Sequence, residues 1–135
     1  MTHTMIARIL GGLLLTLAAD ISASSGTASG ALTQAMAQGE RVFRNQCQGC
    51  HSLEPGVHIA GPSLHGVVGR NAGAVADFEY SAPLQQAQLV WTPESLDRFL
   101  TAPDDFLPGT RMVFWGLDED SRHQLIDYLE QVGER

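Results

Sequence analysis

The chain has 135 residues, of which 44% are hydrophobic, and it carries 15 acidic side chains against 8 basic ones for a net charge of −7. All eight basic residues are arginines, because the sequence contains no lysine. An acidic, lysine-free chain of this kind argues against nucleic acids and anionic membrane surfaces as partners.

Residues 1–23 have the pattern of an export signal. Arg8 ends a short basic region, residues 9–19 are apolar, and small residues follow. The predicted cleavage position is after Ala23, with Ala31 and the run Ala35-Met36-Ala37 as alternatives. Eleven residues rise only about 16 Å as a helix, whereas the hydrocarbon core of a membrane is roughly 30 Å thick. We therefore expect export to a bacterial periplasm and no stable membrane insertion after the signal is cleaved.

The next segment, residues 24–36, is rich in Ser, Gly, Thr and Ala and lacks apolar periodicity, which predicts a flexible leader. The remaining residues, 37–135, are enough for one domain but few for a core made only of side chains.

The first helix is predicted over residues 38–46, with Val42 and Phe43 on its buried face. Gly39 lies on the same face, although glycine inside a helix costs about 1 kcal/mol relative to alanine. Either the helix frays there, or a second helix crosses so closely that a side chain is excluded.

Two cysteines and a histidine follow this helix in the run Cys47-Gln48-Gly49-Cys50-His51. This spacing is the attachment pattern of c-type haem: two thiols reach the porphyrin vinyl groups and the imidazole reaches the iron. A covalently bound porphyrin would also supply much of the missing core. Alternatives are a redox disulfide, because these are the only cysteines, and a zinc site, for which only His58 and His65 lie close by.

Three further helices are predicted in the second half of the chain. Residues 81–88 form a weak candidate, and a second begins with Thr92 as cap and Pro93 at the first helical position and runs to about Leu100. Apolar residues recur at helical spacing over 118–132, after an acidic first turn. The rest is rich in turn signals and shows no strand pattern, so the predicted fold is all-α with long ordered loops.

Met112 is the candidate for a second axial ligand. It ends the loop 106–112, just after a Pro-Gly turn at 108–109. A thioether is a soft neutral ligand that favours ferrous iron and raises the reduction potential. The alternative is that Met112 packs in the loop beside the apolar residues 113–115.

Together these motifs resemble the class I c-type cytochromes and are similar to mitochondrial cytochrome c and bacterial cytochrome c2. The resemblance covers residues 39–129 and implies four to five helices with long ordered loops wrapped around one covalently bound haem c. The matching residues are Gly39, Phe43, Cys47, Cys50, His51, Gly61 to Gly66, Gly69, Arg70, Phe78, Tyr80, Ser81, Trp91, Leu100, Pro103, Pro108 to Met112, Leu125, Tyr128 and Leu129.

The resemblance also implies roles for individual residues. The carbonyl of Pro62 would accept a hydrogen bond from Nδ1 of His51, which fixes the imidazole tautomer. Arg70, Tyr80 and Trp91 would hold the haem propionates, whose charges are costly to bury alone. Arg70 as a solvated charge and Trp91 as core remain alternatives. The crossing of the first and last helices would be formed by Gly39, Phe43, Leu125 and Leu129.

Two departures from the family pattern bear on partners and on the iron. Asp104 and Asp105 stand where mitochondrial-type proteins have lysines that steer the exposed haem edge to acidic partners, and Arg111 is the one cation left there. We therefore expect redox partners with basic or largely apolar docking surfaces. Phe99 stands where the family often has a tyrosine beside the methionine sulfur.

The expected function is that of a soluble monohaem electron carrier, not an enzyme. Cys47 and Cys50 would anchor the haem, and His51 and Met112 would ligate its iron. Alternatives are a fixed haem subunit of a larger oxidoreductase, or a haem enzyme or gas sensor in which Met112 leaves the iron readily.

Overall fold

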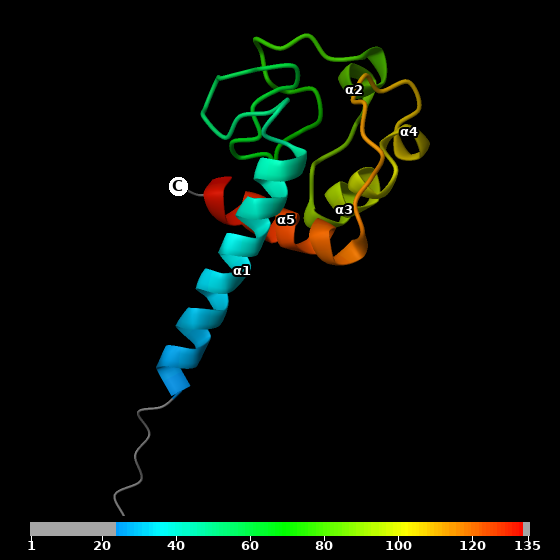
Figure 1. The fold of residues 1–135 in the computed structure, drawn as a ribbon. Coiled ribbons are helices and arrows are strands. Elements are labelled where there is room, and N and C mark those ends of the chain that lie inside the picture. The colour runs from blue at the N-terminus through cyan, green and yellow to red at the C-terminus, as the bar shows by residue number, and fades with distance from the viewer. Residues whose placement is uncertain (1–23, 134–135) are drawn as a thin grey trace, which may run out of the picture.

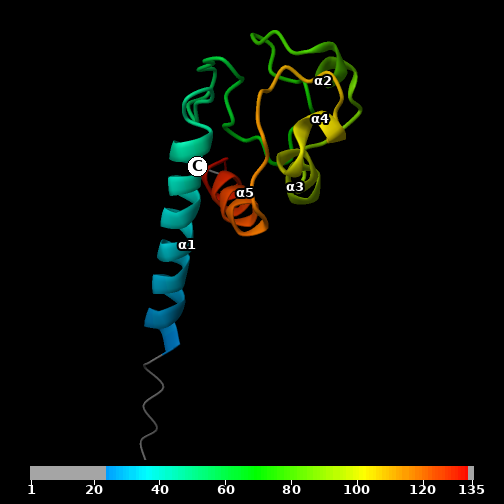
Figure 2. The same ribbon diagram turned by 45° about the vertical axis from the view of Figure 1, so that its right-hand side comes forward.

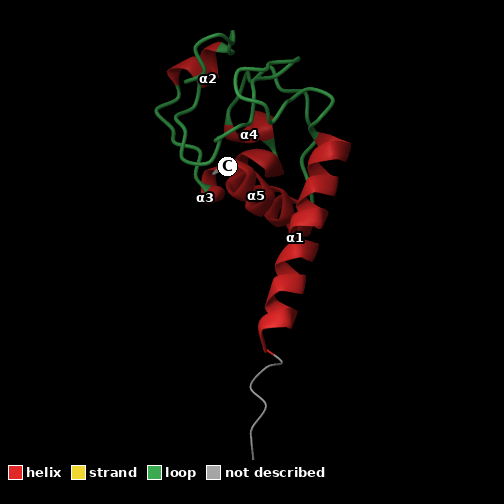
Figure 3. Cartoon of the chain, turned by 90° about the vertical axis from the view of Figure 1, so that its left-hand side faces the viewer, coloured by secondary structure: helices red, strands yellow, loops and turns green. Residues whose placement is uncertain are grey.

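The computed structural model describes residues 24–133; residues 1–23 and 134–135, and with them the predicted export signal, lie outside the described residues. The chain forms α1 (Ser24–Gln46), α2 (Ala82–Gln86), α3 (Pro93–Thr101), α4 (Pro103–Phe106) and α5 (Glu119–Gly133). Within residues 24–133 there is no strand, only two isolated bridges that pair His51 with His58 and Asn71 with Val90. Figure 3 shows helices joined by long loops, which confirms the all-α prediction.

The helix α1 is longer than predicted. Its first half extends away from the rest of the molecule (Figures 1 and 2), and side chains 28–35 are exposed. The segment 24–36, which the sequence indicated to be a flexible leader, is therefore helical in the structure. Packing fixes the second half of α1, and adding residues to an existing helix avoids the cost of a new nucleus.

The helices α1 and α5 cross at Gly39. A Cβ atom there would collide with the backbone oxygen of Gln124 and with Cβ of Tyr128 on α5. One turn later, the rings of Phe43 and Tyr128 are in contact, with centroids 6.2 Å apart. This confirms the second interpretation of Gly39, that a helix crosses closely. The other residues predicted at this crossing are all buried in one core cluster: Phe43, Leu125 and Leu129.

The helix α3 begins as predicted. The hydroxyl of Thr92 accepts from the N–H of Ser95 at 3.1 Å, and the Ser95 hydroxyl accepts from the N–H of Thr92 at 2.8 Å. This reciprocal capping satisfies two backbone donors at the helix start. The buried face of α3, including Phe99 and Leu100, packs into the same core as α5.

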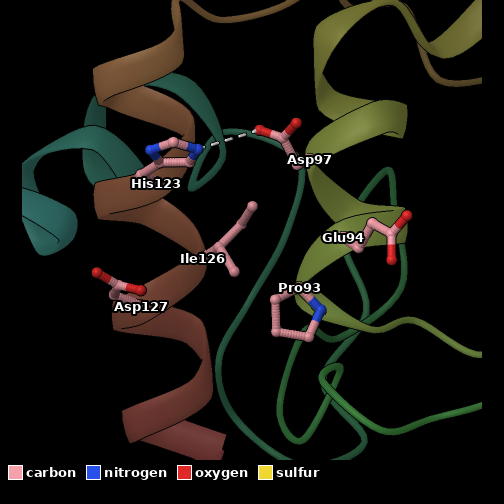
Figure 4. A pocket seen from close by; sticks show the side chains of 6 residues that line it. All are labelled: Pro93, Glu94, Asp97, His123, Ile126 and Asp127. Atoms are coloured by element: carbon pink, nitrogen blue, oxygen red, sulfur yellow. Dashed lines mark ion pairs between the residues drawn. The ribbon is translucent and has the colours of Figure 1, made fainter.

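A polar contact joins α3 to α5 beside a shallow groove. Asp97 accepts from Nε of Arg122 at 2.7 Å, and Nε2 of His123 lies 3.7 Å from the same carboxylate oxygen. The groove is lined by Pro93, Glu94, Asp97, His123, Ile126 and Asp127 (Figure 4). None of the residues predicted to bind haem lines it.

Two short helices differ from the sequence prediction. α2 ends at Gln86, because Ala87 is extended, so it covers only part of the predicted range 81–88. α4 was not predicted, since four residues are too few to show helical periodicity. It starts with the buried Pro103 and carries the exposed Asp104 and Asp105.

Candidate haem-binding site

The two cysteines lie in a tight turn that continues from the end of α1. The N–H groups of Cys50 and His51 both donate to the carbonyl of Cys47, at 3.0 and 2.9 Å. This turn buries the Cys47 side chain and leaves Cys50 exposed, and both thiols are free. Burial is the main cause that raises the pKa of Cys47 to about 11, and the nearby Cys50 thiol is the second. In the polypeptide without haem, the Cys47 side chain is therefore a neutral thiol at physiological pH, and no disulfide joins it to Cys50 in this structure.

The imidazole of His51 is held by the backbone of the 61–62 segment. Its Nδ1 lies 2.8 Å from the carbonyl oxygen of Pro62, as predicted. A carbonyl can only accept, so Nδ1 carries the proton and Nε2 keeps a lone pair for a metal. Burial lowers the pKa of His51, against a smaller opposing effect of the Pro62 hydrogen bond, and so favours the neutral, ligating form.

Gly61 lies directly behind this ring. A Cβ atom at Gly61 would come within 2.7 Å of both ring nitrogens of His51, so no other residue fits without moving the imidazole. The matched motif contains Gly61, but its packing against His51 was not predicted, because only the folded structure brings the two together.

Arg70 ties down the loop that follows Pro62. Its guanidinium donates to the carbonyl of His65 at 2.9 Å and to that of Ser63 at 3.0 Å. Burial lowers the pKa of Arg70, while Tyr80 opposes this shift. The side chain is half-buried and makes two hydrogen bonds within the protein, so it is not a solvated surface charge. It still has N–H donors to offer a ligand, since a guanidinium carries five.

Tyr80 and Trp91 are both buried aromatic residues. Tyr80 makes an edge contact with Phe78, with centroids 4.9 Å apart, and the Trp91 ring packs on Phe99 at 5.1 Å. Trp91 is part of the main core cluster, so the alternative that it has a core role is consistent with its packing.

Ser81, which follows Tyr80, is a residue for which no role was predicted from the sequence. Its hydroxyl is buried and has no hydrogen-bond partner in the protein. Buried polar groups are nearly always paired, so this hydroxyl fits a bound group that brings an acceptor of its own. A single serine beside a tyrosine gives no pattern in the sequence from which this could have been found.

Met112 lies in the segment that connects α4 to α5. Gly109 adopts a left-handed conformation at φ +84°, which makes the predicted Pro-Gly turn, and Met112 is half-buried against the core cluster. Arg111, the residue before Met112, holds this segment in place through Glu79. Its guanidinium donates to the carbonyl of Glu79 at 2.9 Å and lies 3.5 Å from the Glu79 carboxylate. The loop that carries Met112 is thereby joined to the segment before Tyr80.

The predicted ligands come from two separate parts of the fold. Figures 1 and 2 place the turn after α1 and the segment between α4 and α5 on different sides of the upper part of the molecule. Among the described residues, no group of three His, Cys, Asp or Glu side chains is arranged to hold a metal ion, which leaves the zinc alternative without a ligand set. Two thiols, an oriented imidazole, a thioether and an unpartnered buried hydroxyl together fit a c-type haem.

Comparison with known proteins agrees with this donor set. A family model described as cytochrome c oxidase, cbb3-type, subunit III matches residues 34–129. Cytochrome c 2.1 of Caenorhabditis elegans is 43% identical over 94 residues, which are 69% of this chain and 85% of that protein. The chain belongs to the cytochrome c family. Cytochromes c of Ginkgo biloba and Chlamydomonas reinhardtii are 39% and 40% identical over 96 and 99 residues, covering 70% and 72% of this chain and 85% and 88% of theirs.

As a cytochrome c, the protein carries one covalently bound haem c and is an electron carrier, not an enzyme. The haem iron supplies the chemistry by taking up and releasing one electron. The polypeptide supplies two thiols, an imidazole oriented by a hydrogen bond and an apolar core. No helix in the described part of the chain is long and apolar enough to cross a membrane.

Proposed function

We propose that this cytochrome c is a periplasmic one-electron carrier with a six-coordinate haem. Cys47 and Cys50 attach the porphyrin, and His51 and Met112 ligate the iron. The observation that carries the proposal is the 2.8 Å contact between Nδ1 of His51 and the carbonyl of Pro62, which leaves Nε2 of a neutral imidazole free to bind a metal.

The same proposal assigns the haem propionates to a partly buried polar region. Arg70 supplies positive charge from a guanidinium that has further N–H donors available. Tyr80, Ser81 and Trp91 are buried side chains that each carry one polar group. Hydrogen bonds to an ionised group are worth about 1.5–3 kcal/mol each, which helps to offset the cost of burying a carboxylate.

Substitution of Met112 tests the ligand set. In the wild-type ferric protein we expect the far-red charge-transfer band of a sulfur–iron bond, and in Met112→Ala we expect that band to vanish and the midpoint potential to fall. An unchanged spectrum and potential in Met112→Ala would exclude the thioether as ligand. Rapid binding of CO by ferrous wild-type protein at neutral pH would instead favour the haem enzyme or gas sensor with a labile Met112.

The periplasmic location is supported by the export pattern of residues 1–23. We expect cell fractionation to recover the haem protein from the periplasm, and intact-mass analysis to find a chain that begins at Ser24. Recovery of the haem protein with residues 1–23 still attached would contradict cleavage of the signal.

One comparison favours a second candidate, a fixed haem subunit of a larger oxidoreductase. The matching family model is described as an oxidase subunit, whereas the relative from Caenorhabditis elegans is a cytochrome c of which this chain covers 85%. A free carrier should migrate alone in native gels of periplasmic extract. Stable comigration with other redox subunits would favour the second candidate.

A further inference from the structure

The two most exposed large apolar side chains of the described residues lie next to Met112. Val113 is 89% exposed and Trp115 is 96% exposed. Between them, Phe114 is half-buried and packs against the core, as Met112 does. Exposure thus alternates from one residue to the next, as it does where successive side chains point to opposite sides of the chain. Val113 and Trp115 therefore share the outer side of the segment whose inner side carries Met112.

An exposed tryptophan beside a second apolar side chain is typical of an interaction surface. Single exposed apolar residues are ordinary, but tryptophan is the residue type most enriched at the energetic centres of protein interfaces. Interfaces between electron-transfer proteins are small, so one large aromatic side chain is a substantial part of the contact.

Exposed carboxylates precede and follow this pair along the chain. The N–H of Leu117 donates to the carbonyl of Leu100 at 3.0 Å, which places the segment along the end of α3, just before α4. α4 carries Asp104 and Asp105, and α5 begins with further exposed carboxylates. The carboxylates at the start of α5 are Asp118, Glu119 and Asp120.

The arginines of this region are engaged within the protein. Arg111 contacts Glu79, Arg122 contacts Asp97, and the guanidinium of Arg98 lies 4.9 Å from the centre of the Phe106 ring. The charge presented around Val113 and Trp115 is thus predominantly negative.

We propose that Val113 and Trp115 form the apolar anchor by which this cytochrome c docks on a redox protein whose docking face has an apolar centre ringed by lysine or arginine. This inference rests on the proposed function, because the anchor adjoins the haem only if Met112 ligates the iron. Charge complementarity selects the partner: the carboxylates of α4 and α5 attract a basic rim, and the apolar pair enters its centre.

The test uses the ferric holoprotein and a probe of the stated chemistry, mitochondrial cytochrome c with zinc in place of iron, whose porphyrin edge is ringed by lysines. Its photoexcited triplet porphyrin gives one electron to the ferric haem, which leaves a zinc porphyrin cation and a ferrous haem. We expect Trp115→Ser to lower the bimolecular quenching rate constant at least about 10-fold at low ionic strength, equivalent to about 1.4 kcal/mol. Val113→Ser should lower it less.

Matched variants separate the anchor from its charged surroundings. Leu32→Ser removes another exposed apolar side chain, on the projecting part of α1, and should leave the rate unchanged. The pair Asp104→Asn and Asp105→Asn should slow the reaction at low salt and lose that effect at high salt, because exposed charges are screened.

The remaining outcomes distinguish a failure of the proposed function from a failure of the docking proposal. If wild-type protein lacks the sulfur–iron band, the proposed function fails; if Trp115→Ser keeps that band and reacts as fast as wild type, only the docking proposal is overturned. A wild-type dimer that Trp115→Ser abolishes in sedimentation would assign the pair to a second copy of this chain. Binding to phosphatidylcholine vesicles that depends on Trp115 would assign it to a membrane, and either result would overturn the proposal.

Discussion

Ser81 shows how a single polar atom can report on a bound group. Its buried hydroxyl has no partner in the protein, so in the polypeptide alone it costs desolvation free energy without a compensating hydrogen bond. If the hydroxyl donates to a haem propionate, that cost becomes a gain of about 1.5–3 kcal/mol.

A Ser81 hydroxyl that is paired with a propionate and one that stays unpaired predict opposite changes in unfolding free energy when Ser81 is replaced by alanine. We expect Ser81→Ala to lower the unfolding free energy of the holoprotein by about 1–3 kcal/mol, measured by denaturant titration, because a hydrogen bond to a charged group is lost. Ser81→Thr keeps a hydroxyl and is the matched control. If the Ser81→Ala holoprotein were as stable as wild type, or more stable, the hydroxyl would be unpaired in the haem-bound protein as well.

Glycines decide where the elements can approach one another, and α1 offers a matched pair. Gly39 lies against the backbone of α5, whereas a Cβ atom at Gly30 would meet nothing within 4 Å. Alanine is the better helix former by about 1 kcal/mol at either position. Any difference between the two substitutions in their effect on unfolding free energy therefore measures the cost of a side chain at the crossing with α5.

We expect Gly39→Ala to lower the unfolding free energy by about 1–3 kcal/mol, because forcing extra atoms into a packed contact displaces one helix from the other. Gly30→Ala should raise the helix content slightly and leave global stability within about 0.5 kcal/mol. Denaturant unfolding and far-ultraviolet circular dichroism measure both quantities. Equal effects of the two substitutions would mean that α1 and α5 can separate there at no cost.

The start of α5 depends on the charge of Asp118. A hydrogen bond from the backbone N–H of Ser121 to the Asp118 carboxylate, 3.0 Å long, is the largest cause that lowers the pKa of Asp118 below its ordinary value. A carboxyl whose pKa is lower in the folded protein contributes stability above its unfolded-state pKa of about 4, and loses it as the pH falls through the folded-state pKa.

We therefore expect wild type to be more stable than Asp118→Asn at neutral pH, and the difference to disappear on acidification below about pH 4. Asparagine keeps a neutral cap, so the comparison isolates the charge, and the shared haem cancels between the two proteins. Urea titrations at a series of pH values give the difference directly. A difference that grew as the pH fell would contradict the assignment of the pKa shift.

Sequence and structure agree where local signals are strong. The Thr92 cap and the apolar periodicity of 118–132 each specify a helix through neighbouring residues alone, and both helices form. The four-residue α4 is too short for such a signal, and the first half of α1 is helical because it extends a helix fixed elsewhere. The contact of Gly61 with His51 depends on folding, so the sequence offered the residues but not their arrangement.

At the scale of the whole molecule, charge governs encounters with small redox reagents. The net charge of −7 attracts cations and repels anions over a screening length of about 30 Å at 0.01 M salt and about 10 Å at 0.1 M. We expect oxidation of the ferrous protein by the cationic tris(phenanthroline)cobalt(III) to slow as ionic strength rises, and oxidation by the anionic ferricyanide to accelerate. Stopped-flow rates over this range of salt measure both slopes.

The size of these salt-dependence slopes distinguishes the effect of the local electric field from that of the net charge. The pair Asp104→Asn and Asp105→Asn changes the net charge from −7 to −5, since −7 + 2 = −5, so a field set by net charge alone would weaken both slopes by about two-sevenths. If electrons leave beside α4, as the position of Met112 after that helix implies, these two carboxylates should account for a disproportionate share of the salt dependence. Ferricyanide rates that fell with salt in wild type would mean that the reagent meets a positive surface, and the acidic docking face would then be wrong.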